Sequence, residues 1–289
     1  MTATDTALSV DWLAVCRRAV QGLEQVLADA PTTAERVRET GTLGSGGDRT
    51  LLLDAAAEDV VFAQLDAVAR DGHRFYAVSE ERGEVDFGSA HVRVVIDPID
   101  GSLNAKRSVP HYALSVAVAD GPTMADVAFG FVHDFGAREQ FWAWRGRGAW
   151  LDSTCESDDG VRLDPSIGER RNRRGRLELV GIESADPRYV RDHIDALAQA
   201  AHRLRALGAI AITLCEVAAA RMDGMVTLIR SRGVDSAAGQ LIVREAGGVV
   251  SYPDCDEVLG APLDSSPSSR LVAARTERGL HELERVAQP

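Results

Sequence analysis

The hydrophobic period of this chain changes along its length, and that change limits the possible folds more than any other sequence feature. Apolar residues recur at helical spacing in residues 9–29 and 54–70, which end near Pro31 and Gly72. The segments that follow have strand character and are rich in β-branched and aromatic residues, at 75–78, 92–96, 112–119, 126–133 and 140–144. The first half therefore predicts two helices followed by a sheet.

The second half alternates between the two periods. Strands are predicted at 177–182, 225–229 and 249–252, and helices at 187–206, 209–221 and 235–246. A strand-rich first half and an alternating second half predict a layered sandwich of helices and sheets. A polar stretch separates the halves, so we expect an N-terminal α+β domain over 1–165, an arginine-rich linker over 166–175 and a C-terminal α/β domain over 176–289.

Composition narrows the class of protein. The 289 residues carry 32 basic and 44 acidic side chains, a formal charge of −12, with 45% hydrophobic residues. This balance is that of a globular protein, and it disfavours nucleic acid as a partner. No membrane span or signal peptide is predicted, and the four cysteines are scattered, as in a reducing compartment. We therefore expect a cytoplasmic protein.

The most informative motif is the run Asp97-Pro98-Ile99-Asp100-Gly101-Ser102 (residues 97–102), directly after a predicted strand. A plain turn would account for Asp-Pro or Asp-Gly alone. Here two carboxylates lie three residues apart, and Gly-Ser follows them where a short helix could begin. Carboxylates suit Mg²⁺, and a helix start offers free N–H groups to a phosphate. At this point a turn and a metal–phosphate site are both open.

Three further acidic positions gain meaning only in combination. Glu80 lies in an acidic loop after a strand, Asp54 begins a helix, and Asp235 also begins a helix. Taken alone, the loop would be solvated, and an aspartate at a helix start is most simply a cap. Their order along the chain, together with the run at 97–102, is a specific pattern.

That pattern resembles the inositol monophosphatase family, which includes fructose-1,6-bisphosphatases and nucleotide phosphatases. Three blocks carry the resemblance, at residues 79–84, 95–104 and 234–248, and it extends over about residues 40–252. The resemblance implies a layered αβαβα sandwich of the sugar phosphatase type. This family is one of Mg²⁺-dependent, lithium-sensitive phosphatases, and the resemblance implies a Mg²⁺-dependent phosphatase that acts on a small phosphate ester, as a homodimer.

The resemblance further implies the metal ligands. Glu80, Asp97 and the backbone carbonyl of Ile99 would hold one Mg²⁺, and Asp97, Asp100 and Asp235 would hold a second. Two such ions can activate a water on one side and stabilise the leaving oxygen on the other. Two or three ions are both open, because relatives often carry a lysine in the loop before the position of Asp54, whereas Arg49 is the nearest basic residue in this chain.

The catalytic and phosphate-binding roles also come from the resemblance. Asp54 and the Ser102 hydroxyl would orient the attacking water, and the backbone amides of Gly101 and Ser102 would receive the phosphate. Ser102 stands where the family usually has threonine, and it keeps the hydroxyl.

The substrate is the least defined part of the prediction. Inositol-specific relatives tend to have a glutamate seven residues before the last metal aspartate, where this chain has Leu228. Inositol 1-phosphate is the first expectation, with fructose 1,6-bisphosphate, 3′-phosphoadenosine 5′-phosphate and histidinol phosphate as alternatives. The candidate specificity residues are Gly208, Ala209, Arg230 and Arg232.

A different class of function is also open. The only basic cluster comprises Arg170, Arg171, Arg173, Arg174 and Arg176. A solvated loop is the simpler interpretation, and a clamp for a second phosphate or for RNA is the other. A catalytically idle binding protein could use this cluster, and the loss of a metal carboxylate would favour it, but none is lost.

Overall fold

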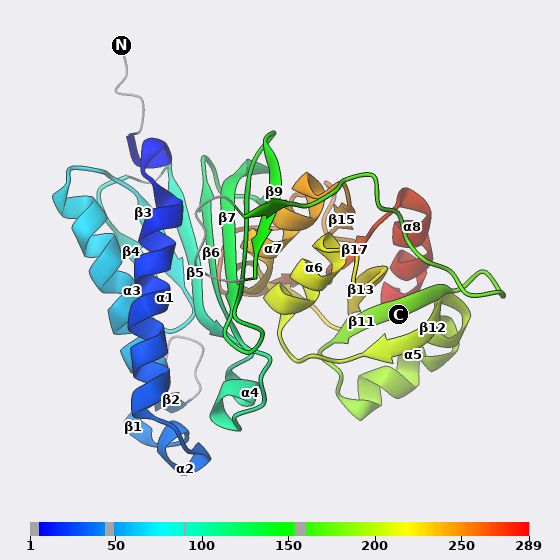
Figure 1. Ribbon diagram of the computed structural model, residues 1–289, viewed down its shortest axis with the longest axis horizontal. Helices are drawn as coiled ribbons and strands as arrows, with labels where there is room; N and C mark the ends of the chain where they lie inside the picture. Colours follow the sequence, from blue (N-terminus) through cyan, green and yellow to red (C-terminus); the bar gives the residue numbers. More distant parts are fainter. Residues whose placement is uncertain (1–5, 44–48, 90, 154–159, 289) are drawn as a thin grey trace.

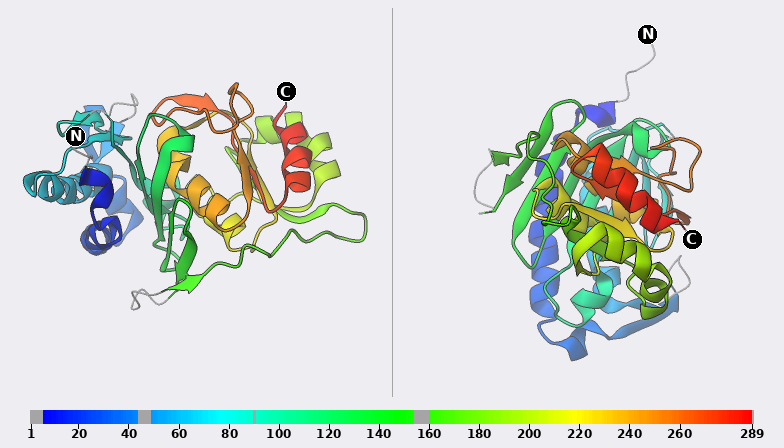
Figure 2. Two further views of the ribbon diagram at one scale, coloured as in Figure 1. Left: turned by 90° about the horizontal axis from the view of Figure 1, so that it is seen from above. Right: turned by 90° about the vertical axis from the view of Figure 1, so that its right-hand side faces the viewer.

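Five layers of helices and sheets stack along the longest axis of the protein (Figure 1). The structure is a computed structural model that describes residues 6–43, 49–89, 91–153 and 160–288. Three pairs of helices form the helical layers: α1 (Trp12–Asp29) with α3 (Leu52–Arg70), α6 (Ile210–Ala218) with α7 (Gly233–Glu245), and α5 (Pro187–Ala200) with α8 (Glu277–Ala287). One sheet lies between each two neighbouring layers, as the view from above in Figure 2 shows. The expected αβαβα sandwich is confirmed.

The larger sheet has eight strands in the order β10-β9-β8-β7-β6-β5-β3-β4. They are β3 (Tyr76–Ser79), β4 (Gly83–Asp86), β5 (Arg93–Asp100), β6 (Ala113–Ala119), β7 (Val127–Asp134), β8 (Glu139–Trp144), β9 (Gly148–Asp152) and β10 (Val161–Arg162). Only β3 and β5 run parallel to each other; the other neighbours are antiparallel. Every residue of β6 is buried, because helices cover both faces of the sheet there.

The smaller sheet has five strands in the order β12-β11-β13-β17-β15. They are β11 (Leu177–Glu183), β12 (Ala201–Arg205), β13 (Gly224–Thr227), β15 (Val249–Ser251) and β17 (Val272–Ala274). The remaining elements are short: α2 (Thr33–Arg36), α4 (Ser102–Lys106), the pairs β1 (Glu39–Leu43) with β2 (Arg49–Leu51) and β14 (Ser231–Arg232) with β16 (Pro267–Ser269), and the 3-10 turns Thr6–Ser9 and Met124–Asp126.

Helices α6 and α7 join the two sheets through one hydrophobic core. Leu214 of α6 and Leu241 of α7 are fully buried in a cluster that includes Ala117 of the larger sheet and Met225 of the smaller. Residues 233–243 of α7 are all buried and most of them are small or apolar, so this part of the helix has no face toward solvent. The two sheets are therefore held by shared packing.

Helix α1, unlike the buried α7, is amphipathic, with one buried face and one exposed face. Its buried residues, among them Val15, Ala19 and Leu23, recur at three- and four-residue spacing and face α3 and the larger sheet. The Asp11 carboxylate accepts a hydrogen bond from the N–H of Ala14 and caps the helix. None of the helices within the described ranges is long and apolar enough to cross a membrane.

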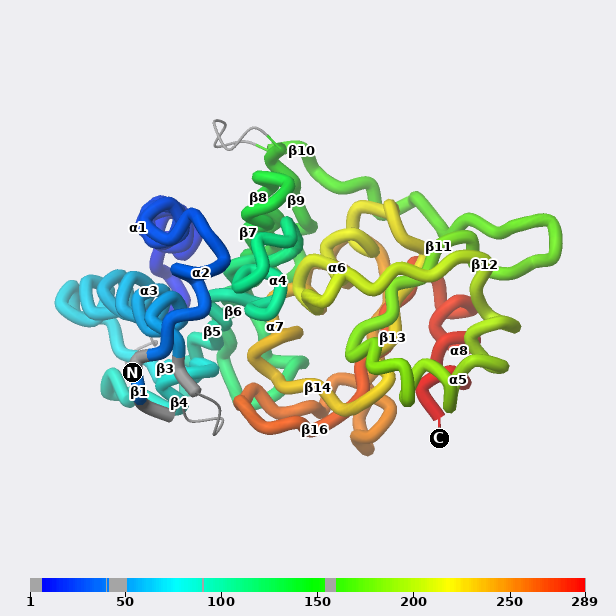
Figure 3. The backbone as a smooth tube through the Cα atoms, turned by 90° about the horizontal axis from the view of Figure 1, so that it is seen from below, coloured from blue at the N-terminus to red at the C-terminus, as the bar shows by residue number. Residues whose placement is uncertain are grey.

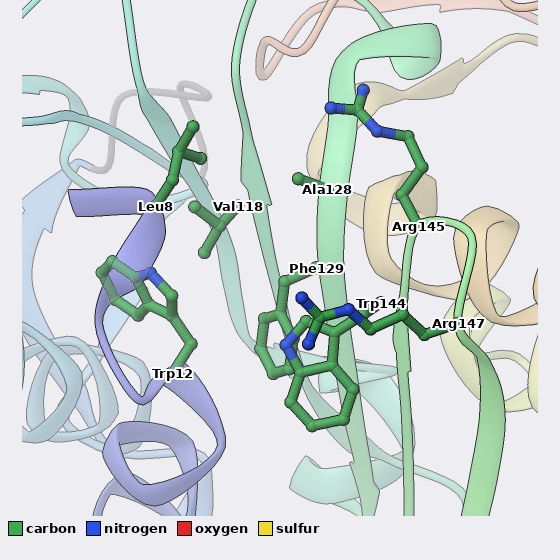
Figure 4. Close-up of a pocket in the computed structure, with 8 residues that line it drawn as sticks. All are labelled: Leu8, Trp12, Val118, Ala128, Phe129, Trp144, Arg145 and Arg147. Carbon is green, nitrogen blue, oxygen red and sulfur yellow. The ribbon is translucent and has the colours of Figure 1, made fainter. Parts of the chain in front are cut away.

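A cavity of about 190 Å³ lies where the beginning of α1 approaches the larger sheet (Figure 4). Leu8 and Trp12 line it from one side, and Phe129 and Trp144 from the sheet. The ring of Trp144 also meets Trp150 edge-on at 5.6 Å. The tryptophans of this sheet thus pack against one another and within the cluster that includes α1.

The structure corrects two predictions. The helix expected over 187–206 ends at Ala200, and residues 201–205 form β12, which runs parallel to β11. Without a glycine or proline at that point, the sequence does not mark the change. The linker is not wholly solvated either, because Arg171 pairs with Glu169 and places Nη1 2.8 Å from Glu282 Oε2 on α8.

Candidate active site

Two candidate ligands lie side by side because their strands are parallel. Ser79, the last residue of β3, is opposite Ile96 of β5, so Glu80 and Asp97 follow at the same edge of the sheet. Asp235 reaches this edge from the first turn of α7, which packs against β5. One carboxylate oxygen from each of these three residues lies within 4.8 Å of the other two.

Asp100 lies outside this group of three carboxylates and is bound by the beginning of α6. The pairing of β5 with β6 shifts register between Asp97 and Asp100, which turns the end of β5 toward α6. Asp100 Oδ2 accepts a 2.6 Å hydrogen bond from the N–H of Ala211, in the first turn of that helix. A carboxylate there complements the helix dipole. Asp100 therefore connects the larger sheet with the middle helical layer.

A sharp turn then begins α4, where the short helix was predicted. Gly101 has a φ of +84°, and a Cβ at this position would lie 2.7 Å from the carbonyl oxygen of His111. Asn104 Nδ2 donates to the carbonyl oxygens of His111, at 2.8 Å, and Leu207, at 2.7 Å. These bonds hold α4 beside the segment that leads into α6, as seen from below in Figure 3.

A pocket of about 400 Å³ opens at this point. It is lined by Asp100 at the end of β5, by Gly101 and Ser102 at the start of α4, and by Gly208, Arg232 and Asp235 from the opposite side. The pocket thus combines acidic side chains with the exposed N–H groups at the start of α4. It could receive a small phosphate ester.

The carboxylates oppose one another's charge. Burial raises the pKa of Asp97, and Glu80, Asp100 and Asp235 raise it further. The pKa of Asp100 is raised by burial and then by Asp235, against the hydrogen bond from Ala211. A divalent cation would remove these penalties, since it stabilises every ionised carboxylate around it.

Two cations of the chain itself lie among these carboxylates. Lys106, the only lysine in the sequence, places Nζ 3.6 Å from Asp54 Oδ2. Burial raises the pKa of Asp54, and Lys106 opposes that rise. Arg232 contacts both Glu80 and Asp235. With five carboxylates (Asp54, Glu80, Asp97, Asp100 and Asp235) and two cations, the site keeps an excess of negative charge.

Two buried glutamates support the site from behind. Glu58 on α3 accepts hydrogen bonds from the Ser79 hydroxyl and, at 3.2 Å, from the N–H of Glu81, on either side of Glu80. Glu183, at the end of β11, accepts from the N–H of Gly208 at 3.1 Å and from the Thr213 hydroxyl at 2.6 Å. Burial raises the pKa of both glutamates. The sequence does not single out these positioning residues, because neither belongs to the motif blocks.

Comparison with known proteins agrees with this geometry. The family model described as "Inositol monophosphatase family" matches residues 10–288. The chain belongs to the inositol monophosphatase family. It is therefore a phosphatase, a phosphoric monoester hydrolase, of a family that acts on small phosphate esters and is generally metal-dependent.

Similar proteins carry several names. A fructose-1,6-bisphosphatase/inositol-1-monophosphatase of Methanothermobacter thermautotrophicus is 32% identical over 94% of each chain. The Nus factor SuhB of Escherichia coli K12 is 33% identical over 83% of this chain and 84% of its own. The crystal structure of the extragenic suppressor protein suhB from Bartonella henselae superposes with a TM-score of 0.75 over 96% of this chain and 99% of that one. Its identity is 24%, so it supports the fold alone.

The residues of this family member fit a metal ion. Asp97 Oδ2 is buried and has no hydrogen-bond partner among the described residues. An unpaired buried carboxylate oxygen is costly unless a cation satisfies it. Carboxylate oxygens are also the donors that Mg²⁺ prefers. The acidic cluster can therefore hold a hard divalent cation.

Of the four predicted specificity residues, two line the pocket and the other two lie elsewhere. Gly208 and Arg232 line the pocket. Ala209 is buried, and its Cβ lies 3.0 Å from where a Cβ of Gly101 would be. Arg230 is 60% exposed and places Nη2 3.8 Å from Asp254.

Proposed function

We propose that this family member is a Mg²⁺-dependent phosphomonoesterase that hydrolyses a small polyol or sugar phosphate. The observation that carries the proposal is the acidic cluster of Glu80, Asp97 and Asp235, with the unpaired Asp97 Oδ2, at a pocket that also contains the start of α4. Carboxylates alone would repel a phosphate dianion, so a cation between them is required.

The proposed ligand sets are those of the resemblance. Glu80, Asp97 and the carbonyl of Ile99 would hold one Mg²⁺, and Asp97, Asp100 and Asp235 a second. When bound, the metal lowers the pKa of a water and neutralises charge on the phosphate and the leaving oxygen. A third ion near Asp54 is not needed for this proposal, since Lys106 already supplies a cation there.

The residues of the chain have the remaining tasks. Asp54, on the first turn of α3, would accept a proton from the attacking water, with the Ser102 hydroxyl orienting that water. The pairing of Lys106 with Asp54 favours the ionised carboxylate that this task requires. The N–H groups of Gly101 and Ser102 would hold the phosphate at the start of α4.

Inositol 1-phosphate is the first substrate to test, and fructose 1,6-bisphosphate the second. Relatives named fructose-1,6-bisphosphatase/inositol-1-monophosphatase and inositol-1-monophosphatase support testing both esters. Leu228 is 3% exposed, so it cannot contact sugar hydroxyls. Histidinol phosphate and 3′-phosphoadenosine 5′-phosphate are the further alternatives. A cytoplasmic location and a homodimer are also part of this proposal.

Phosphate release from these four esters, with Mg²⁺ and with EDTA, tests the proposal. Asp97→Asn removes a central ligand, and Asp195→Asn, an exposed aspartate on α5, is the matched control. We expect metal-dependent release that Asp97→Asn loses and Asp195→Asn keeps. Release that is equal in EDTA, or unchanged in Asp97→Asn, would contradict the metal mechanism.

A binding role is a second candidate because a relative is named Nus factor SuhB. The arginine cluster offers it limited support. Arg171 is engaged by Glu169 and Glu282, and Arg176 donates to the carbonyl oxygen of Ala198 at 2.9 Å. Arg173 and Arg174 are exposed. Salt-sensitive RNA retention on a filter, lost in an Arg173→Ala/Arg174→Ala variant, would favour this role over the phosphatase alone.

A further inference from the structure

The guanidinium of Arg232 lies between two candidate metal ligands. Its Nη1 is 2.5 Å from Glu80 Oε1. Its Nη2 is 2.7 Å from Asp235 Oδ1, and its Nε is 3.1 Å from Asp235 Oδ2. Arg232 thus makes a two-pronged ion pair with one carboxylate and a single ion pair with the other.

These contacts use oxygens that a metal ion would need. Glu80 Oε1 and both oxygens of Asp235 already accept hydrogen bonds from a cation, while Asp97 Oδ2 is left without a partner within the described part of the chain. The guanidinium and a divalent ion would use the same oxygens of Glu80 and Asp235, and like charges in a buried space repel each other. Each therefore opposes the binding of the other at these two carboxylates.

The backbone around Arg232 is fixed, whereas its side chain has room to move. Arg232 belongs to β14, which pairs with β16, and the Ser231 hydroxyl donates to the carbonyl oxygen of Ser269 at 3.1 Å. Gly233 follows in a space where a Cβ would lie 2.4 Å from the carbonyl oxygen of Pro262. The Arg232 side chain is 30% exposed and lines the 400 Å³ pocket. Displacement can therefore occur by rotation of the side chain alone.

We propose that Arg232 is an internal cation that competes with the metal for Glu80 and Asp235. In the metal-free protein it neutralises these two carboxylates and stabilises the site. Metal binding requires that it leave, so it raises the Mg²⁺ concentration at which the site fills. This inference rests on the metal site of the proposed function.

The competition has a measurable size. Only molecules in which Arg232 is displaced can bind the metal. The apparent dissociation constant is therefore the intrinsic one divided by the fraction of such molecules. A bidentate, charge-assisted ion pair favours the arrangement with Arg232 bound to Asp235 over the displaced one by at least about tenfold. Arg232→Met should therefore bind Mg²⁺ at least about tenfold more tightly than the wild type.

Calorimetric titration of the metal-free full chain with Mg²⁺ is the first measurement. The variants are Arg232→Met, Arg232→Lys and Arg230→Met, the last a matched control because Arg230 is a nearby arginine paired with Asp254. We expect the largest gain in affinity for Arg232→Met, a smaller gain for Arg232→Lys, which keeps the charge but loses the fork, and none for Arg230→Met. Equal gains in Arg232→Met and Arg230→Met would show a general charge effect and overturn the proposal.

Thermal unfolding gives an independent readout. In EDTA, Arg232→Met should melt below the wild type, because the buried carboxylates lose their counter-ion, and saturating Mg²⁺ should restore it. An unchanged melting temperature in EDTA would overturn the proposal. If Arg232→Met does not fold without metal, Arg232→Lys carries the test, and wild-type affinity in that variant would refute competition. Wild-type protein that takes up Mg²⁺ no better than Asp97→Asn would instead refute the metal site itself.

Discussion

His133 on β7 should make the protein less stable in weak acid. The side chain is 1% exposed, and neither ring nitrogen has a hydrogen-bond partner among the described residues. Leu114 of β6 and Gln140 of β8 lie opposite it in the sheet, and the ring of Phe135 meets it edge-on at 4.7 Å. Burial, and then the charge of Arg138, lower the pKa of His133 to about 4.

The direction and the size of this pH effect on stability follow from the difference in pKa between the folded and the unfolded chain. Because the unfolded imidazole has a pKa near 6.5, the unfolded chain binds more protons between pH 6.5 and pH 4, and the free energy of unfolding falls as the pH is lowered through that window. For a single site with these two pKa values, His133 lowers the free energy of unfolding by about 2–3 kcal/mol at pH 4.5 and by well under about 1 kcal/mol at pH 7.

His133→Leu removes the titrating ring and keeps a similar apolar volume. Urea unfolding in EDTA at both pH values should show that the variant gains about 2 kcal/mol relative to the wild type between pH 7 and pH 4.5. His91→Leu is the control, because it removes an exposed histidine and leaves His133 in place. A relative gain below about 0.5 kcal/mol for His133→Leu would refute the assignment of a buried, neutral imidazole.

Three further variants test the site. Gly101→Ala should lower the free energy of unfolding by about 1–3 kcal/mol in a urea titration, because its φ of +84° and a carbonyl oxygen 2.7 Å from the new Cβ oppose a side chain; a smaller loss would show that the turn adapts. Lys106→Met should raise the pKa of Asp54 further and so move the acid limb of the pH profile of kcat/KM to higher pH. Arg107→Met is the control and should leave that limb in place. Equal pH profiles for the two variants would contradict the role given to Lys106. Glu183→Gln places an amide N–H₂ group among donors that the carboxylate now accepts from. It should lower the free energy of unfolding by about 1–3 kcal/mol and raise KM, and an unchanged melting temperature would refute the positioning role of Glu183.

Hydrophobic pattern predicted most of the fold because burial follows the helical period in α1 and α3, and because the continuous apolar run of β6 is buried throughout. It failed at Ala200, where α5 ends and β12 begins without a glycine or proline, and the alternating segment gains strand geometry only by pairing with β11. Amphipathic α8, capped by Thr276, was not predicted although its spacing carried the signal.

In the site, the neighbouring positions of Glu80 and Asp97 follow from two parallel strands that end together. The resemblance supplied Asp54 and Asp235, and their roles stay predictions. The pairing of Lys106 with Asp54 depends on how α3 and α4 approach, and that of Arg232 with Glu80 on the β14–β16 pair. Such contacts between distant segments leave no local pattern in the sequence.

The distance along the chain between the two sides of the acidic cluster has a consequence for biosynthesis. Arg232 and its partner Glu80 are 152 residues apart, so at ribosomal rates roughly 8–30 s separate their synthesis. During that interval the nascent chain presents Glu80 and Asp97 without the arginine or the aspartate that later completes the site. A chain that stops before Asp235 therefore carries only part of the acidic cluster, and the proposed metal site cannot be complete before that residue has been synthesised and α7 has folded against β5.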